Sequence, residues 1–275
     1  MPVPRLDHGF DGALRSAPFT DGLLDFDAAC NGLEPVRLAV VEGLVLLDLS
    51  GTAPSPHEHV GDLAGLMARY RLGELRRSAK LVYDVGANWK AVAENYSECL
   101  HCPGVHPELN RLSHYLSGEE ITGAGAWCGG SMTLGEGFET MAVDGGHGRP
   151  PIEGVTDLRS ILYFVLFPNA LVSLHPDYVM LHTLWPRAAG RTDVVCEWFF
   201  EARTIAAPDF DPADAVDFWD QVNREDWHVC ELTQQGMASS AYEPGRYTTR
   251  EGDVHEFDAM VAGRYLEALG AEVAR

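Results

Sequence analysis

NWKAVAENYSECLHCPGVHPEL, residues 88–109, is the most informative segment of this chain. It contains two histidines, His101 and His106, with Pro103 and Gly104 between them. Neutral imidazole is the commonest metal ligand in proteins. Two imidazoles and a carboxylate from another segment form the facial triad of non-haem Fe(II) sites. The histidine pair therefore predicts a metal centre.

The two histidines are five residues apart, so they can bind one metal only if the backbone between them is not a regular helix. On a regular helix with 3.6 residues per turn, side chains five apart point about 140° away from each other. Residues 89–100 contain few helix breakers and predict a helix. Proline disfavours a helical conformation at the residue before it, and glycine frees the backbone. We therefore expect the helix to break at Pro103–Gly104, so that His106 returns to the side of His101.

Composition narrows the class of protein. The chain has 275 residues, of which 46% are hydrophobic, which is enough for one large domain with a sizeable core. The net charge is −21, from 20 Lys and Arg against 41 Asp and Glu, and disfavours binding to nucleic acids or anionic membranes. The first residues lack a secretion-signal pattern, and no apolar run reaches the ~20 residues of a membrane span. We expect a cytoplasmic protein.

The cysteines are expected to be free thiols, as is usual in a reducing cytoplasm. Cys99 and Cys102 flank His101 in a C-x-x-C pattern, which would also suit a zinc–thiolate or redox site. No second matching cysteine pair and no βαβ pattern accompany them, so we interpret both as small buried residues of the ligand-bearing helix. The other cysteines are Cys30, Cys128, Cys196 and Cys230.

The pattern along the chain predicts an α+β fold. Helices set apart from runs of strands are typical of an antiparallel sheet packed on helices. The expected elements are a hairpin over 36–49 with its turn at Glu42–Gly43, a helix over 57–72, strands over 79–87 and 192–204, two or three strands over 160–186 with turns at Pro168–Asn169 and Pro176–Asp177, and a long helix from Asp211–Pro212 to about Ala238.

Three long motifs resemble the catalytic domain of Rieske-type non-haem iron oxygenase alpha subunits, the ring-hydroxylating oxygenase family. They are residues 88–109, FPNALVSLHPDYVMLHTLWP over 167–186 and NREDWHVCELTQQGMASSAYEPGRYTTREGDVHEF over 223–257. The resemblance implies a helix-grip (START/Bet v 1-like) fold for residues 36–275, in which a curved antiparallel sheet packs on a long C-terminal helix. Family members form trimers, so a homo-oligomer is expected.

The resemblance also implies a set of site residues. His101 and His106 match the two iron-binding histidines, and Asp226 matches the carboxylate ligand. The expected metal is Fe(II), with Zn(II) as the alternative. Glu98 matches the acidic residue that, in the family, links the iron to a Rieske cluster of a neighbouring subunit. It could otherwise fix a histidine ring or act as a general base.

The residues around Asp226 support its assignment independently. Its helix carries Trp227 and Cys230 and is expected to be largely buried, and a buried carboxylate needs a partner or a metal. Glu225 and Glu231 are the competing candidates on the same helix.

A substrate pocket is expected beside these ligands. Asn95 and Tyr96 precede them on the same helix and are candidates for the pocket or for supporting the ligands. The remaining lining is predicted to be apolar and aromatic, which suits a small organic or aromatic molecule but would serve equally well as sheet core. Its candidates are Trp127, Met132, Tyr163, Val165, Leu174, Met180 and Leu184.

The N-terminal segment departs from the family pattern. A Rieske cluster needs Cys-x-His and Cys-x-x-His motifs, because two thiolates and two imidazoles hold its irons. When the segment is aligned on Phe10-Asp11-Gly12, Met1 and Pro4 fall where the family has cysteine and histidine. We therefore expect residues 1–35 to be the truncated or degenerate end of a Rieske domain and its linker, with no [2Fe–2S] cluster in this chain.

These features lead to a first hypothesis and two alternatives. The first is a mononuclear Fe(II) oxygenase that acts with O2 on a small organic molecule. Its electrons would come from the substrate, a separate Rieske partner or an added reductant. The second is a non-redox hydrolase or lyase that uses metal-bound water. The third is a non-catalytic ligand-binding protein, against which the intact ligand set argues.

Overall fold

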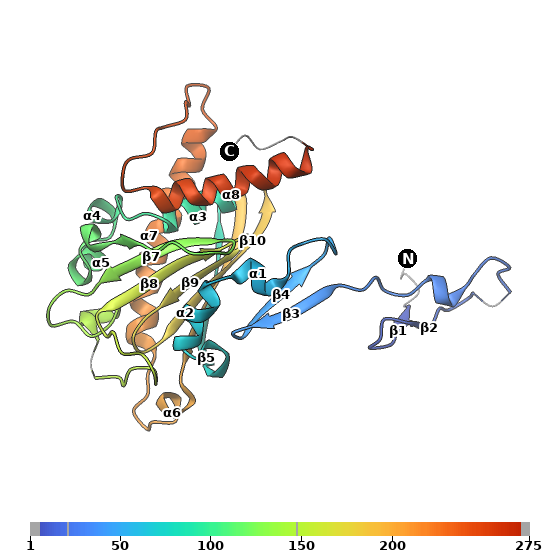
Figure 1. Cartoon of the computed structure of the whole chain (residues 1–275), viewed down its shortest axis with the longest axis horizontal. Helices are drawn as coiled ribbons and strands as arrows, with labels where there is room; N and C mark the ends of the chain where they lie inside the picture. The colour runs from blue at the N-terminus through green and yellow to red at the C-terminus, as the bar shows by residue number, and fades with distance from the viewer. Residues whose placement is uncertain (1–5, 21, 147, 271–275) are drawn as a thin grey trace. The chain divides into compact units, whose positions relative to one another are not determined.

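The computed structural model of the chain describes residues 6–20, 22–146 and 148–270 (Figure 1). The chain divides into two compact units, Met1–Val40 with Val45–Ser55, and Val41–Leu44 with Pro56–Arg275. Met1 and Pro4, on which the expectation of a lost cluster depends, lie outside the described residues.

Short elements make up the N-terminal region. Strands β1 (Asp7–His8) and β2 (Leu14–Ser16) pair antiparallel, and a 3-10 turn, η1, follows at Ala28–Cys30. The predicted hairpin is confirmed: β3 (Arg37–Val41) and β4 (Leu44–Asp48) form a two-stranded sheet. Glu42 and Gly43 make its turn, both with positive φ, 47° and 85°. Two consecutive residues of positive φ suit the right-handed twist of a hairpin.

A seven-stranded antiparallel sheet forms the centre of the second unit, as predicted, in the order β5-β11-β10-β9-β8-β7-β6 (Figure 1). Five of its connections join neighbouring strands, whereas β5 pairs with the last strand, β11, placing Val85 opposite Thr192. The strands are β5 (Arg76–Val85), β6 (Glu119–Glu120), β7 (Trp127–Thr133), β8 (Ser160–Leu166), β9 (Ala170–Leu174), β10 (Val179–Ala188) and β11 (Arg191–Phe200).

Helices cover one face of this sheet. Strand β11 alternates buried and half-buried residues, with Cys196, Trp198 and Phe200 completely buried. The long helix α7 (Ala213–Met237) lies close to the predicted range, and its buried residues include Phe218 and Trp219. Each fully buried side chain of this size stabilises the fold by about 1.5–3 kcal/mol. Other helices that contribute to this core include α3 (Trp89–Tyr96) and α8 (Gly252–Ala268), and α8 was not predicted.

The predicted helix over 57–72 is two helices, α1 (Pro56–Val60) and α2 (Leu63–Arg69). They are separated at Gly61, whose φ is +54°, and a Cβ there would overlap the carbonyl oxygen of Ala124. The remaining elements are α4 (Cys102–Val105), α5 (Pro107–Leu112), α6 (Ala202–Ile205) and the 3-10 turns η2 (Leu72–Glu74), η3 (Tyr115–Ser117) and η4 (Val143–Gly145). Among the described residues, no helix is both long enough and apolar enough to span a bilayer.

The backbone around the two histidines differs from the prediction. Helix α3 begins after its cap, Asn88, whose side chain accepts a hydrogen bond from the backbone of Lys90 at 3.0 Å, and it ends at Tyr96 rather than at residue 100. The expected break at Pro103–Gly104 is wrong, because both residues lie inside α4. Proline is tolerated in the first turn of a helix, where its missing N–H would have no partner. The chain changes direction instead over residues 97–101 and again at residue 106.

Candidate metal centre

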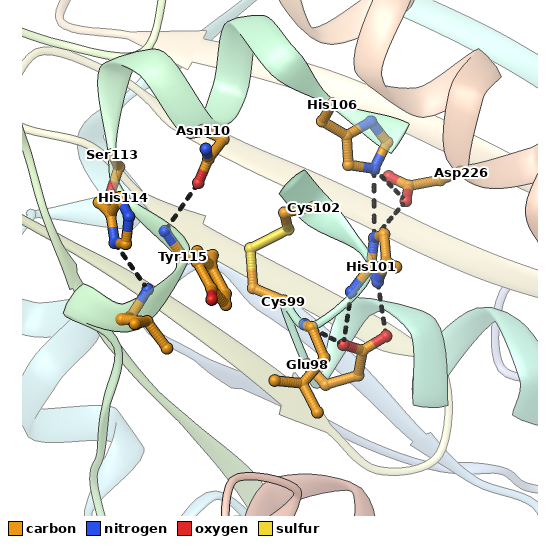
Figure 2. The surroundings of a disulfide bond; sticks show 12 residues. Glu98, Cys99, His101, Cys102, His106, Asn110, Ser113, His114, Tyr115 and Asp226 are labelled. Carbon is orange, nitrogen blue, oxygen red and sulfur yellow. Dashed lines mark hydrogen bonds and ion pairs between the residues drawn. A yellow bond between two sulfur atoms is a disulfide. The ribbon is translucent and has the colours of Figure 1, made fainter. Parts of the chain in front are cut away.

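The structure brings together the three residues predicted as metal ligands (Figure 2). One ligand atom from each of His101, His106 and Asp226 lies within 4.8 Å of the others. Asp226 Oδ1 is 2.8 Å from Nε2 of His106 and 3.2 Å from Nε2 of His101, and the two Nε2 atoms are 3.2 Å apart. Two nitrogens and one oxygen therefore face a common point.

Local backbone structure explains how residues five apart can converge. His101 is the N-cap of α4, and His106 lies between α4 and α5 with φ −122° and ψ 71°. Pro107 disfavours a helical conformation at His106, so the chain turns there. Asp226 lies on α7, a separate and largely buried helix. The third ligand thus comes from a rigid element far along the chain.

Each histidine ring is held from its other side by a carboxylate. Glu98 Oε1 accepts a hydrogen bond from Nδ1 of His101 at 2.5 Å, and Glu225 Oε2 accepts one from Nδ1 of His106 at 2.7 Å. An ionised carboxylate can only accept, so Nδ1 carries the proton in both rings and both Nε2 atoms are turned toward Asp226. Glu225, a competing ligand candidate in the sequence, thus contacts Nδ1 of His106, the nitrogen that faces away from Asp226.

The carboxylate of Asp226 is oriented by a neighbour on α3. Asn95 Nδ2 donates a hydrogen bond to Asp226 Oδ1 at 2.7 Å. Tyr96, the next residue, makes a hydrogen bond of 2.7 Å between its hydroxyl and Ser173 Oγ on β9. Glu231 is turned away from the ligands and accepts a hydrogen bond from the backbone of Gly86.

The electrostatics of the three ligand candidates favour a cation at the point where their ligand atoms meet. Burial lowers the pKa of His101, but hydrogen bonds to Asp226 and Glu98 raise it to about 9. Burial raises the pKa of Asp226, but hydrogen bonds from His101 and His106 lower it to about 2. Asp226 is therefore ionised at neutral pH, and its negative charge attracts a proton or a metal ion to the facing nitrogens. This donor set fits Fe(II) and also Zn(II).

A cavity of about 250 Å³ lies beside the ligands. Its lining includes five of the residues proposed from the sequence: Asn95, Tyr96, Met132, Tyr163 and Val165. The other candidates do not line it and require correction: Trp127, Leu174, Met180 and Leu184. The indole of Trp127 donates to the carbonyl of Ala124 and stacks edge-on against Phe164, and Met180 is completely buried in the core. The alternation of apolar and polar residues along a strand identifies buried residues, but it does not show which of them line a cavity.

Several lining residues had not been singled out in the sequence. Trp219 lies two helical turns before Asp226 on α7, so helix periodicity places both on one face and could have identified it. The segment before α8 offered no such signal. The lining residues not predicted include Glu119, Glu120, Tyr115, Trp219, Thr249, Arg250 and Asp253.

Cys99 and Cys102, which flank His101 in the sequence, form a disulfide, which corrects the expectation of free thiols for this pair (Figure 2). Their Cα atoms are 5.0 Å apart, within the usual range for a disulfide. The turn over residues 97–101 brings the two side chains together, whereas the expectation rested on composition alone. Cys30, Cys128, Cys196 and Cys230 are free thiols.

Comparison with known proteins identifies relatives. The chain is 28% identical to the glycine betaine monooxygenase oxygenase subunit of Pseudomonas aeruginosa, over 99% of this chain and 71% of that protein. It is 24% identical to the chloroplastic choline monooxygenase of Arabidopsis thaliana, over 92% of this chain and 60% of that protein. A solved structure of a quaternary ammonium Rieske monooxygenase, described as giving insights into carnitine oxidation and inter-subunit electron transfer, has the same fold. Its TM-score is 0.75, with 19% identity over 98% of this chain and 72% of that chain.

The family model for the catalytic domain of the ring hydroxylating alpha subunit matches residues 72–267. This range contains the sheet, the three ligand candidates and the cavity. Since the match covers most of the chain, the protein belongs to the ring-hydroxylating alpha-subunit family of Rieske-type non-haem iron oxygenases, and the matched residues are the catalytic domain.

Proposed function

We propose that this chain is the catalytic part of a mononuclear non-haem Fe(II) monooxygenase, with His101, His106 and Asp226 as the iron ligands. One observation carries the proposal: three ligand atoms converge within 4.8 Å beside a cavity large enough for a small molecule. Iron held there would supply the activation of O2, because a facial triad leaves coordination positions free. We also propose that residues 36–275 form a domain with the helix-grip fold.

The residues of the chain have distinct roles in this proposal. Glu98 keeps the proton of the His101 ring on Nδ1 and turns its Nε2 toward the iron position. Asn95 fixes the orientation of the Asp226 carboxylate. Productive chemistry depends on placing the substrate within a few ångströms of the ligand set, which is the task of the cavity walls.

For the substrate we propose a small quaternary ammonium compound. Glycine betaine, choline and carnitine occur in the names of the matched relatives. Aromatic faces attract alkylammonium groups, and nearby carboxylates add to the attraction. The cavity offers both kinds of group, in Tyr96, Tyr115, Tyr163 and Trp219 and in Glu119, Glu120 and Asp253.

For the electrons we propose a donor outside the catalytic domain, reaching the iron position through Glu98. The side chain of Glu98 is 17% exposed and bonds directly to His101. Residues 1–35 are, in this proposal, the end of a Rieske domain and its linker. The inter-subunit transfer described for one matched structure supports assembly of this chain into a homo-oligomer. A non-redox hydrolase or lyase gains no support, since the named relatives are monooxygenases.

The test combines metal analysis with oxygen consumption. Purified protein loaded with Fe(II) should retain iron rather than zinc in elemental analysis, and should consume O2 when given glycine betaine, choline or carnitine with a reductant. His101→Ala and Asp226→Ala should lose iron and activity together. His228→Ala is the matched control, because His228 is an exposed histidine two residues after Asp226. Full iron retention in His101→Ala would refute the ligand assignment.

A further inference from the structure

We infer that Glu225 is a positioning residue of the metal centre, which fixes the tautomer and ring plane of His106. The inference deepens the proposed function and depends on its ligand set. It rests on the contact of 2.7 Å between Glu225 Oε2 and Nδ1 of His106. The sequence motif had left Glu225 only as a rival to Asp226.

His106 is held between two consecutive residues of one helix. Glu225 contacts its Nδ1 and Asp226 contacts its Nε2 at 2.8 Å. Consecutive side chains on a helix point about 100° apart, so together they reach two sides of one ring. The His106 side chain is only 1% exposed, which leaves the ring little freedom to turn out of this arrangement.

Glu225 is itself held in place. Gln221, one turn earlier on α7, donates a hydrogen bond from Nε2 to Glu225 Oε1 at 3.0 Å. Residues four apart on a helix are surface neighbours, so this contact forms without any change in the backbone. Each carboxylate oxygen of Glu225 therefore has one partner, Oε1 with Gln221 and Oε2 with His106.

The position of Glu225 excludes it as the third ligand. Its oxygen lies at the far nitrogen of His106, whereas the meeting point of the ligand atoms lies at the near nitrogen. The role instead resembles that of Glu98, which contacts Nδ1 of His101. Carboxylates in this position raise the basicity of a metal-bound imidazole and set its orientation.

Partial exposure makes this role separable from folding. The side chain of Glu225 is 28% exposed, so water can replace it when it is removed. Its loss should weaken metal binding while leaving the stability of the metal-free protein nearly unchanged, because partly exposed carboxylate contacts contribute little to folding.

The experiment measures the affinity of the metal-free full chain for Co(II), followed by its visible absorption. Glu225→Ala should weaken Co(II) binding on the order of 10- to 100-fold. Glu225→Gln retains a carbonyl acceptor for the Nδ1 proton and should recover part of this loss. Asp217→Ala is the control, because it removes an exposed carboxylate from the same helix; it should bind as the wild type does.

Different outcomes separate the inference from the proposed function. If His106→Ala loses Co(II) while Glu225→Ala binds as tightly as the wild type, the inference is wrong and the ligand set stands. If His106→Ala binds normally, the ligand set itself is wrong. If Glu225→Ala does not fold, Glu225→Gln and Gln221→Ala replace it. If these variants lose Co(II) affinity only in proportion to a lowered melting temperature, the loss reflects destabilisation and the positioning role is wrong.

Discussion

Replacing Glu94 with glutamine should make the protein more stable at pH 8, and should have a much smaller effect at pH 5. Glu94 on α3 is half-buried and hydrogen-bonds to Asp258 on α8. Burial, followed by the charge and hydrogen bond of Asp258, raises the pKa of Glu94 from 4.5 to about 7, although the charge of Lys90 opposes this. The ionised form of Glu94 is therefore disfavoured in the folded protein.

The sign and size of the effect follow from proton linkage. Between pH 4.5 and 7 the folded protein holds a proton on Glu94 that the unfolded chain has released, so stability falls as the pH rises through this range. The difference between a pKa of 4.5 and a pKa of about 7 corresponds to about 3.5 kcal/mol, at about 1.4 kcal/mol per pH unit. Solvent screening of a half-buried group reduces this to about 1–2 kcal/mol. Glutamine has no charge to desolvate and can still donate to Asp258.

The assay is urea unfolding and thermal melting of the wild type and Glu94→Gln at pH 5, 6, 7 and 8. At pH 8 the variant should melt about 2–4 °C higher for each kcal/mol gained. Asp217→Asn, which removes an exposed acid, should show no such difference. An equal gain at every pH, or a less stable variant at pH 8, would refute the reasoning.

Three further predictions concern the core, the sheet and the disulfide. Arg149 is half-buried, and its Nε lies 2.7 Å from the buried carboxylate of Asp177. Arg149→Met should therefore cost about 3–5 kcal/mol in urea unfolding, and adding Asp177→Asn should restore part of it. Gly129→Ala should prevent folding, because the residue has φ +147° and a Cβ would overlap a carbonyl of β8; a normal circular dichroism spectrum would contradict this. Alkylation of unfolded protein should label four thiols without reductant and six with it, because Cys99 and Cys102 are bonded; six without reductant would disprove the bond.

Local sequence signals predicted much of the architecture. The turn at Glu42–Gly43 and the range of α7 follow from turn residues and from acidic residues near a helix start, which act over a few neighbours. The three ligand candidates were identified because their motifs resemble those of a known family. Each of these signals depends only on residues within a short segment. It can therefore be recognised in a single sequence without knowledge of the tertiary structure.

Features that depend on tertiary contacts were missed. Pro103 was expected to break a helix. A proline breaks a helix only when it lies in the helix interior, and here it lies in the first turn of α4. The local sequence does not show that a new helix begins at this point. The role of Glu225 depends on which way α7 is rotated against His106. The cavity walls depend on which buried residues of the sheet remain uncovered, which excluded Trp127 and Met180.

The pairing of β5 with β11 joins the two parts of the chain that supply the ligand candidates. β5 leads into the segment with both histidines and β11 precedes the helix with Asp226, so this pairing closes a long loop. Long-range strand pairing is a slow part of folding, because loop-closure entropy is lost before contacts compensate for it. A refolding chain with α3, α4 and α5 in place holds only two of the three proposed ligands. We therefore expect metal uptake in a refolding experiment to follow the arrival of α7, and a fragment that ends before α7 to bind the ion poorly.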